Sequence, residues 1–330
     1  MDQKIFPVAV IGGGSAGTMA VMRTVLNNDE TLFFPGTAKD KKRSRAFWVS
    51  KVENVPGHLR FTKGIEQPNR ENLDWLTECD LKDKFHWYRN IGITKIEKRD
   101  DGIFVLTDTN TFQHLARHVI LCTGAMDIQP EINGTIQDIL PYANVQLADY
   151  CLRCDGHHVL GKKTALIGHD DGAAWVAIML YERYQTPEMK VLCNGEKAQF
   201  SEETLKLMTK YKIEIVPQAI VKVKGNAREK RLEGFVFDNN LETETEICFI
   251  SLGMIVYNQL ALMLKADVDK RGFVVTNNKG ETSVPGLYVA GDLRAGIKKQ
   301  IYTAWDSAVD SADDINYKLR TLKRNSSLAK

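Results

Sequence analysis

Two cysteines separated by two residues, Cys151 and Cys154, have the clearest chemistry in this sequence. Such a C-x-x-C pair can form and open a disulfide, because one thiolate attacks a disulfide sulfur and the second cysteine resolves the mixed disulfide. Asp155 follows directly and can carry a proton to or from the attacking thiol. The pair also suits half of a zinc site, but the sequence offers no second C-x-x-C or H-x-x-H, so we predict no metal.

The charged neighbours of the pair leave two interpretations open. Arg153 lies between the cysteines and can favour the thiolate, or it can be an ordinary solvated surface charge. His157 and His158 follow two residues after Asp155. They can tune the thiols, but we expect solvated loop histidines.

A glycine-rich turn near the N-terminus is typical of a dinucleotide-binding unit. The sequence predicts a strand at 8–11, a helix at 18–26 and a second strand at 31–34, with the glycines after the first strand. Glycines let the backbone approach a pyrophosphate, and the helix N-terminus offers N–H groups and partial positive charge. The predicted binding residues are Gly12, Gly14, Ser15, Ala16 and Gly17.

The same order of strand, glycine turn and helix occurs again later in the sequence, but with an altered turn. A strand at 164–167, a turn at 168–172, a helix at 173–184 and a strand at 190–193 repeat the order. The middle glycine is replaced by Asp170, however, and such a carboxylate would repel a pyrophosphate. Two such units predict an α/β fold with two Rossmann-like, doubly wound three-layer domains. Further strands are predicted at 102–107, 118–122, 214–223 and 232–237. In the glycine-bearing stretch 284–292 a strand runs into Gly291-Asp292, followed by a helix at 300–319 and a frayed polar tail at 324–330.

The composition excludes several classes of protein. Hydrophobic residues make up 43% of 330 residues, enough for two domains with their own cores. The net charge is +2, which does not favour nucleic-acid binding, and no apolar run approaches the roughly 20 residues of a membrane span. There is no signal-peptide pattern, and one close cysteine pair is typical of a cytoplasmic protein. We expect buried structural thiols at Cys79, Cys122, Cys193 and Cys248.

Further motifs follow in a definite order. They are Val52-Glu-Asn54-Val-Pro-Gly57, Cys122-Thr123-Gly124-Ala125, Ser251-Leu-Gly253, Val289-Ala-Gly291-Asp292 and Lys299-Gln300-Ile301. Together with the glycine turn and the redox pair, this order resembles the low-molecular-weight thioredoxin reductase family of flavoproteins. The resemblance spans nearly the whole chain.

The resemblance implies a discontinuous FAD domain, 1–119 plus 247–330. A pyridine-nucleotide-type domain, 120–246, would be inserted between the two parts, carry the redox cysteines, and swing to present them alternately to the flavin and to a protein substrate. Cys154 would face the flavin, Cys151 would attack the substrate, and the protein would be a homodimer. FAD contacts are implied for Asn54, Thr123, Gly124, Gly291, Asp292, Gln300 and Ile301, with Asp292 on a ribityl hydroxyl and Gln300 and Ile301 at the pyrimidine edge.

Several positions depart from the family pattern. Members that use NADPH carry a histidine and two arginines where this sequence reads Asn194-Gly195-Glu196, and a usual carboxylate is Trp175. With Asp170, these changes predict that NADPH is not the electron donor. On the FAD side, Arg43-Ser-Arg45-Ala46 replaces Gly-Gly-Gln-Leu, and Pro35 stands where an acid sometimes binds the ribose.

The leading hypothesis is a flavin-dependent disulfide reductase of a pyridine-nucleotide-independent branch. That branch resembles ferredoxin-dependent and deeply rooted relatives, in which a second FAD can occupy the nicotinamide side. A thioredoxin-like protein disulfide would be the acceptor. A basic cluster can steer an acidic ferredoxin or simply be solvated: Lys39, Lys41, Lys42, Arg43 and Arg45.

Three alternatives stay open at this stage. The first is an NADPH-dependent thioredoxin reductase with a divergent nucleotide loop. The second is an FAD-dependent dithiol oxidase, although those proteins typically carry histidine where this sequence has Asp155. The third is a flavin-binding redox sensor, which has no need for a C-x-x-C pair followed by an acid. The tail 324–330 lacks the aromatic residue common in ferredoxin-linked members, so the donor is not fixed.

Overall fold

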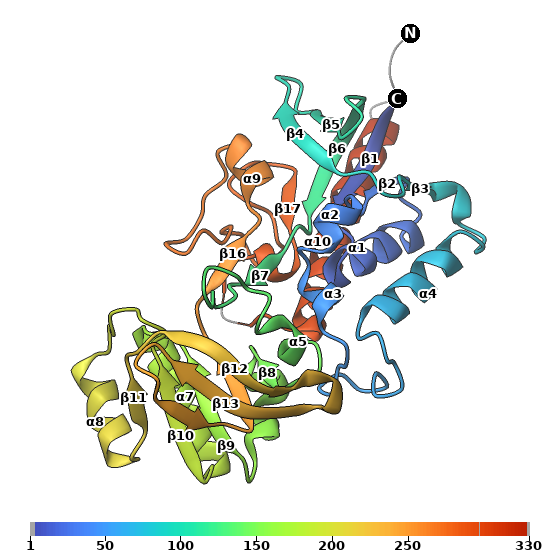
Figure 1. Ribbon diagram of the computed structural model, residues 1–330. Helices are drawn as coiled ribbons and strands as arrows, with labels where there is room; N and C mark the ends of the chain where they lie inside the picture. The colour runs from blue at the N-terminus through green and yellow to red at the C-terminus, as the bar shows by residue number, and fades with distance from the viewer. Residues whose placement is uncertain (1–3, 297, 329–330) are drawn as a thin grey trace. The chain divides into compact units, whose positions relative to one another are not determined.

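The computed structural model describes residues 4–296 and 298–328. Within this part of the chain the backbone forms two compact units (Figure 1). Unit 1 comprises Met1–Lys51, Val55–Met126 and Val256–Lys330, and unit 2 comprises Val52–Asn54 and Asp127–Ile255. No described helix is long and apolar enough to cross a membrane.

The sheet of unit 1 is mostly parallel. Its described strands have the order β3-β2-β1-β6-β5-β4, and β17 also pairs with β6. The pairs β4-β5 and β5-β6 are antiparallel, whereas β1 pairs in parallel with β2 and β6. The strands are β1 (Ile5–Ile11), β2 (Thr31–Phe34), β3 (Phe85–Trp87), β4 (Ile93–Lys98), β5 (Phe104–Asp108), β6 (Gln113–Leu121) and β17 (Leu287–Val289).

Strand β1 is buried on both faces. Val8 and Val10 pack in one cluster with helices α1, α4 and α10, while Ala9 and Ile11 pack on the opposite side with residues of β5 and α9. Successive strand residues point to opposite faces, so a continuous apolar run is required for a parallel sheet covered on both sides. The helices of unit 1 are α1 (Ser15–Leu26), α2 (Ala38–Lys41), α3 (Arg45–Trp48), α4 (Glu66–Leu76), η1 (Lys82–Lys84), α9 (Gln259–Met263), η4 (Gly291–Leu293) and α10 (Ile301–Leu328).

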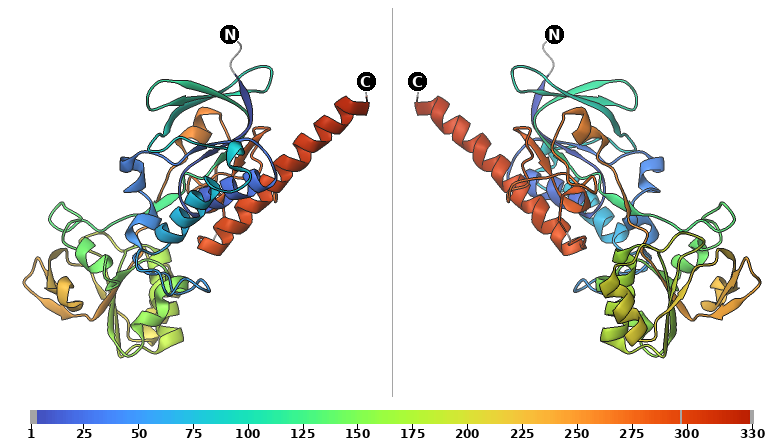
Figure 2. Two further views of the ribbon diagram at one scale, coloured as in Figure 1. Left: turned by 90° about the vertical axis from the view of Figure 1, so that its right-hand side faces the viewer. Right: turned by 90° about the vertical axis from the view of Figure 1, so that its left-hand side faces the viewer.

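Helix α10 is longer than the sequence predicts. It appears as one continuous helix in Figure 2 and runs to Leu328, well past residue 319, so the tail expected to fray is helical as far as the structure describes it. Its N-terminal half is held against the core by Ala304, Ala308 and Ile315, whereas residues 322–328 are exposed. Continuation of the helical backbone hydrogen bonds, rather than burial, therefore accounts for the last turns.

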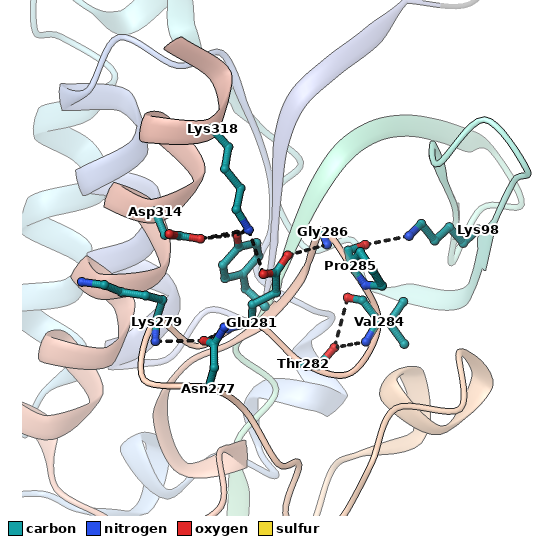
Figure 3. A network of polar contacts seen from close by, with 11 residues as sticks. Lys98, Asn277, Lys279, Glu281, Thr282, Val284, Pro285, Gly286, Asp314 and Lys318 are labelled. Atoms are coloured by element: carbon teal, nitrogen blue, oxygen red, sulfur yellow. Dashed lines mark hydrogen bonds and ion pairs between the residues drawn. The ribbon is translucent and has the colours of Figure 1, made fainter. Parts of the chain in front are cut away.

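A polar network fixes the segment that leads into β17 (Figure 3). Glu281 accepts a hydrogen bond from the Gly286 backbone N–H at 2.9 Å and pairs with Lys318 of α10 at 2.7 Å. Lys318 also donates to the hydroxyl of Tyr288 at 2.6 Å and lies 3.1 Å from Asp314. Because Tyr288 belongs to β17, the network ties this strand to helix α10.

Unit 2 contains a parallel sheet with the order β11-β10-β9-β15-β8 in the described residues, next to an antiparallel sheet β12-β13-β14. The strands are β8 (Ala148–Asp149), β9 (Lys163–Ile167), β10 (Glu188–Leu192), β11 (Glu214–Val216), β12 (Ile220–Asn226), β13 (Arg231–Phe237), β14 (Glu242–Glu244) and β15 (Ile247–Ile250). The helices are α5 (Leu140–Ala143), α6 (Leu152–Asp155), η2 (Gly156–Val159), α7 (Asp171–Tyr184), α8 (Glu202–Lys210) and η3 (Ala227–Glu229). The predicted α/β class with two Rossmann-like sheets is confirmed.

The chain passes between the units in β7 (Ala125–Asp127) and β16 (Met254–Val256). The units therefore divide near 126/127 and 255/256, whereas the sequence predicted 119/120 and 246/247. The first boundary lies later because β6 runs to Leu121 and pairs with β1 in the sheet of unit 1. The second lies later because β15 pairs with β9 and so belongs to the sheet of unit 2.

Two smaller predictions need correction. The single strand predicted at 214–223 is two strands in different sheets, because the chain breaks at Pro217, which cannot donate to a ladder. Cys122, Cys193 and Cys248 are buried as expected, but Cys79 is only half-buried. Burial raises the pKa of the Cys122 and Cys248 thiols, which keeps both protonated and inert.

Candidate functional site

The N-terminal glycine turn of unit 1 fits a pyrophosphate. A Cβ at Gly12, where φ is +113°, would lie 2.3 Å from the carbonyl oxygen of Cys122, and one at Gly17 would lie 1.8 Å from the carbonyl oxygen of Gly12. No heavy atom lies within 4 Å of a Cβ built on Gly14, which caps α1 without a side-chain hydrogen bond. The packed glycines hold the turn closed, while the open space at Gly14 adjoins the first N–H groups of α1, at Ser15 and beyond.

Two other turns lie against this one. A Cβ at Gly291, where φ is +75°, would lie 2.7 Å from Cβ of Ala16, so the C-terminal glycine turn contacts the start of α1. Thr123 donates its hydroxyl to the carbonyl oxygen of Tyr257 at 2.6 Å, and the Tyr257 N–H donates to Gly124 at 3.1 Å. The structure thus gathers the expected residues of 12–17, 123–124 and 291–292 at the carboxyl ends of β1, β6 and β17.

Asp292 has an unexpected partner. Its Oδ2 atom lies 3.0 Å from Nη1 of Arg45, and both side chains are about one-fifth exposed. Arg45 stands in the stretch that departs from the family pattern and was expected to belong to the exposed basic cluster. The structure instead separates it from that cluster, because the aspartate charge holds the guanidinium.

Lys299 and Gln300 precede α10. Gln300 is buried, and its backbone N–H donates to Oγ1 of Thr303 at 3.2 Å. The ammonium of Lys299 lies 3.8 Å above the ring of Phe273 and donates to the carbonyl oxygen of Arg294 at 2.5 Å. Burial lowers the pKa of Lys299 to about 8, despite the raising effect of Asp292.

Two predicted FAD-contact residues remain, Ile301 and Asn54. Ile301 is the first residue of α10. Asn54 lies in the segment Val52–Asn54, which groups with unit 2. The contact of Asn54 with a flavin ring stays a prediction.

The redox pair lies in unit 2 just after β8. Cys151 and Cys154 form a disulfide that spans the first turn of α6, and the Cys154 N–H donates to Sγ of Cys151 at 3.1 Å. Asp155 ends this short helix and is half-buried, whereas Arg153 is exposed. Since a backbone N–H is already directed at Sγ of Cys151, a thiolate formed there would gain a charge-assisted hydrogen bond.

The sequence predicted two solvated loop histidines, and solvation holds only for His157, which is exposed, whereas the side chain of His158 is mostly buried. They lie in η2, and Nε2 of both contacts Oε2 of Glu53, at 2.7 Å for His157 and 3.1 Å for His158. His158 also contacts the buried Asp149 through Nδ1, at 2.8 Å. Hydrogen bonding to Asp149 is the main reason that the pKa of His158 is raised to about 9. Sequence reasoning missed Glu53 and Asp149, since nothing in the spacing joins Glu53 to a histidine 104 residues away.

The second glycine turn is closed by its own side chains. Asp170 caps α7 by accepting the N–H of Ala173 at 2.8 Å. Oδ1 of Asp171 accepts both the Ser201 N–H at 2.8 Å and the hydroxyl of Thr204 at 2.7 Å. The Gln199 N–H donates to the carbonyl oxygen of His169 at 2.7 Å, so the neighbouring segment is bonded to the turn itself.

The stretch 194–196 has a structural role. Oδ1 of Asn194 accepts the Ile220 N–H at 2.8 Å, and its Nδ2 donates to the carbonyl oxygen of Glu131 at 2.9 Å. Gly195 has φ of +80° and Glu196 is exposed. Asn194 therefore joins the loop at Glu131 to the start of β12.

A dinucleotide cradle in one Rossmann-like unit and a redox-active C-x-x-C in the other define an FAD-dependent disulfide oxidoreductase of the thioredoxin reductase type. The chain belongs to the pyridine nucleotide-disulphide oxidoreductase family, whose model matches residues 6–312. FAD is the cofactor that this family implies.

Similar proteins agree with that assignment. Thioredoxin reductase of Treponema pallidum is 26% identical over 310 residues, 91% of this chain and 92% of the relative. Thioredoxin reductase of Bacillus subtilis is 24% identical over 98% of this chain and 97% of the relative. The solved structure of thioredoxin reductase from Streptococcus pyogenes has a TM-score of 0.81 at 18% identity, with 97% of this chain and 100% of that chain covered, and shows the same fold.

Alanine substitutions should separate the two roles of the glycine turn, which are close packing at Gly17 and pyrophosphate binding at Gly14. Gly17→Ala should lose both the fold and the flavin, because the new Cβ would overlap the carbonyl oxygen of Gly12. Gly14→Ala should keep a melting temperature close to that of the unmodified protein but lose about tenfold in FAD affinity, since its methyl group would fill the open space. Flavin absorbance per chain measures flavin binding, and melting followed by circular dichroism measures the stability of the fold. Undiminished flavin binding by Gly14→Ala would contradict the assignment of this space.

Replacement of Lys299 should change how stability depends on pH. The pKa is about 8 in the folded protein and 10.5 in the unfolded chain, so the unfolded state holds more protons between these values. The contribution of this residue to stability should therefore rise with pH from about 8 to 10.5 and be flat below pH 8. The full difference in pKa corresponds to about 3.4 kcal/mol, and solvent screening of this partly exposed group reduces the expected rise to about 2 kcal/mol. Urea denaturation of flavin-free Lys299→Met should lack that rise, whereas the exposed neighbour Lys298→Met should keep it. Parallel curves for the two variants would refute the role of burial.

Proposed function

We propose that this protein is a thioredoxin-reductase-like disulfide reductase whose electrons come from a donor other than NADPH. Bound FAD would carry electron pairs from that donor to the Cys151–Cys154 disulfide. A protein disulfide of the thioredoxin type would be the acceptor, as the names of the relatives suggest. The observation that carries the proposal is the capping of α7 by Asp170.

A nucleotide pyrophosphate binds this kind of turn through the first N–H groups of the helix. Here Asp170 already accepts the Ala173 N–H, and Asp171 stands beside it. A phosphate charge about 4 Å from one carboxylate would be repelled by roughly 4 kcal/mol at an effective dielectric constant near 20. This repulsion is larger than the roughly 1 kcal/mol that a pyrophosphate would gain from one hydrogen bond with an N–H group of the turn. The turn therefore disfavours a pyrophosphate.

A basic surface of unit 1 supports an acidic protein as the donor. Lys39, Lys41, Lys42 and Arg43 are exposed, and of these Lys41 pairs with Glu66 at 3.0 Å. Such a surface raises the encounter rate with an acidic partner, and ferredoxin is the one-electron donor that we propose. Two such encounters would deliver the electron pair that one disulfide needs.

The dithiol would act by exchange. The Cys151 thiolate attacks one sulfur of the acceptor disulfide and forms a mixed disulfide, while the other acceptor sulfur leaves as a thiolate. Cys154 then attacks Sγ of Cys151, which restores the Cys151–Cys154 disulfide and releases the acceptor as a dithiol. Asp155 would take the proton from the attacking thiol and return it to the leaving thiolate.

A second candidate is an NADPH-dependent thioredoxin reductase with a divergent loop. The match to a pyridine nucleotide-disulphide family model over residues 6–312 favours it. A homodimer, a second flavin and a cytoplasmic location stay predictions.

An anaerobic assay of flavin reduction should distinguish the two candidates. We expect reduced ferredoxin to bleach the visible flavin band rapidly, and NADPH and NADH at micromolar concentrations to leave it unchanged. Reversal of Lys41 and Lys42 to glutamate should slow the ferredoxin reaction about tenfold, more so at low ionic strength, because charge steering is lost. Rapid bleaching by NADPH would overturn the proposal in favour of the second candidate, and oxygen consumption with a small dithiol would favour a dithiol oxidase.

Replacement of Asp155 should affect thiol chemistry alone. Asp155→Asn should slow reduction of a thioredoxin-type disulfide by the pre-reduced protein about 10²-fold, because the proton carrier is lost. Flavin content should not change. The exposed neighbour Arg153→Ala is the matched control and should react at nearly the unmodified rate. Equal rates for Asp155→Asn and the unmodified protein would remove the acid–base role.

A further inference from the structure

Three side chains from two distant parts of the sequence, Glu53 and the adjacent His157 and His158, converge beside the redox pair. Oε2 of Glu53 lies 2.7 Å from Nε2 of His157 and 3.1 Å from Nε2 of His158. The three ligand atoms all lie within 4.8 Å of one another. Within residues 4–296 and 298–328, no other group of three or more such side chains has this arrangement.

The spacing suits one metal ion after small side-chain shifts. Zinc bonds to histidine nitrogen and carboxylate oxygen are about 2.0–2.2 Å, so two ligand atoms on a tetrahedral ion are about 3.3 Å apart. The Glu53 contacts at 2.7 and 3.1 Å therefore need to open by about 0.6 Å for His157 and about 0.2 Å for His158. The side chain of His157 is 51% exposed, which leaves it free to rotate, whereas Glu53 and His158 are less than one-fifth exposed.

The other ring nitrogen of His158 has the kind of partner that a metal-ligating histidine needs. His158 contacts the buried Asp149 through Nδ1 at 2.8 Å, while Nε2 faces the cluster. A metal-ligating histidine usually has its other ring nitrogen on a carboxylate, which fixes the tautomer and turns the free lone pair towards the ion. Asp149 thus has the position of the supporting carboxylate.

We propose that Glu53, His157 and His158 form a site for a divalent transition-metal ion, with Asp149 as the supporting partner of His158. Two imidazoles and one carboxylate suit zinc, and three protein ligands leave a fourth position for water or another ligand. His157 is the most exposed of the three ligands, so solvent reaches the cluster on its side. The ion would tie Glu53 to η2, two residues beyond Asp155. This site goes beyond the proposed function and differs from the sequence-based prediction of no metal.

Zinc binding by the full-length, flavin-loaded protein tests the proposal. The protein is kept oxidised, so that the disulfide-bonded Cys151 and Cys154 cannot act as ligands, and is dialysed against buffered zinc. We expect one zinc ion per chain by elemental analysis. Glu53→Gln and His157→Gln should weaken the dissociation constant at least tenfold, and Asp149→Asn by about 10–100-fold.

A matched control comes from unit 1. His86 and Glu30 form a similar histidine–carboxylate contact at 2.7 Å but have no second histidine, so His86→Gln should bind zinc as the unmodified protein does. Melting temperatures with and without zinc show whether each variant folds and whether zinc stabilises it. Absence of bound zinc, or unchanged binding by His157→Gln, would overturn the site. Flavin reduction and disulfide exchange in zinc-free protein are separate measurements, so failure of either proposal can be distinguished.

Discussion

Close approach of three turns at the carboxyl ends of β1, β6 and β17 is the constraint on which the cradle of unit 1 depends. The backbone of Gly12 lies against Cys122, Gly17 lies against Gly12, and Gly291 lies against Ala16, each too close for a Cβ. Parallel strands bring their ends to one edge of the sheet, so turns from distant segments meet there. The buried run of β1 and the polar network that ties β17 to α10 keep these ends in register.

Unit 2 repeats the arrangement of strand, turn and helix, with a side-chain cap in the turn. Gly168 keeps the close packing, because a Cβ there would lie 2.5 Å from Cβ of Ala173. Asp170 meanwhile accepts the Ala173 N–H at the N-terminus of α7. A capping side chain of this kind stabilises a protein by about 1 kcal/mol. The helix therefore gains stability in the absence of any ligand.

The redox pair depends on short-range geometry and on charges brought from elsewhere. The first turn of α6 places Cys154 N–H on Sγ of Cys151, which needs only four consecutive residues. The surrounding carboxylates and histidines come from β8, η2 and the segment Val52–Asn54. This combination explains why a disulfide motif can be recognised locally while its electrostatic environment cannot.

The sequence by itself determined the features that neighbouring residues control. Glycines 12 and 17 signal a tight turn because a Cβ cannot fit, and the C-x-x-C spacing alone permits the Cys151–Cys154 disulfide. Only the tertiary structure decided the pairing of Arg45 with Asp292, the meeting of Glu53 with the two histidines, and the assignment of β15 to unit 2. The physical reason is range: turn conformation and periodicity depend on adjacent residues, whereas contacts across more than 80 positions depend on which strands pair and which faces they bury.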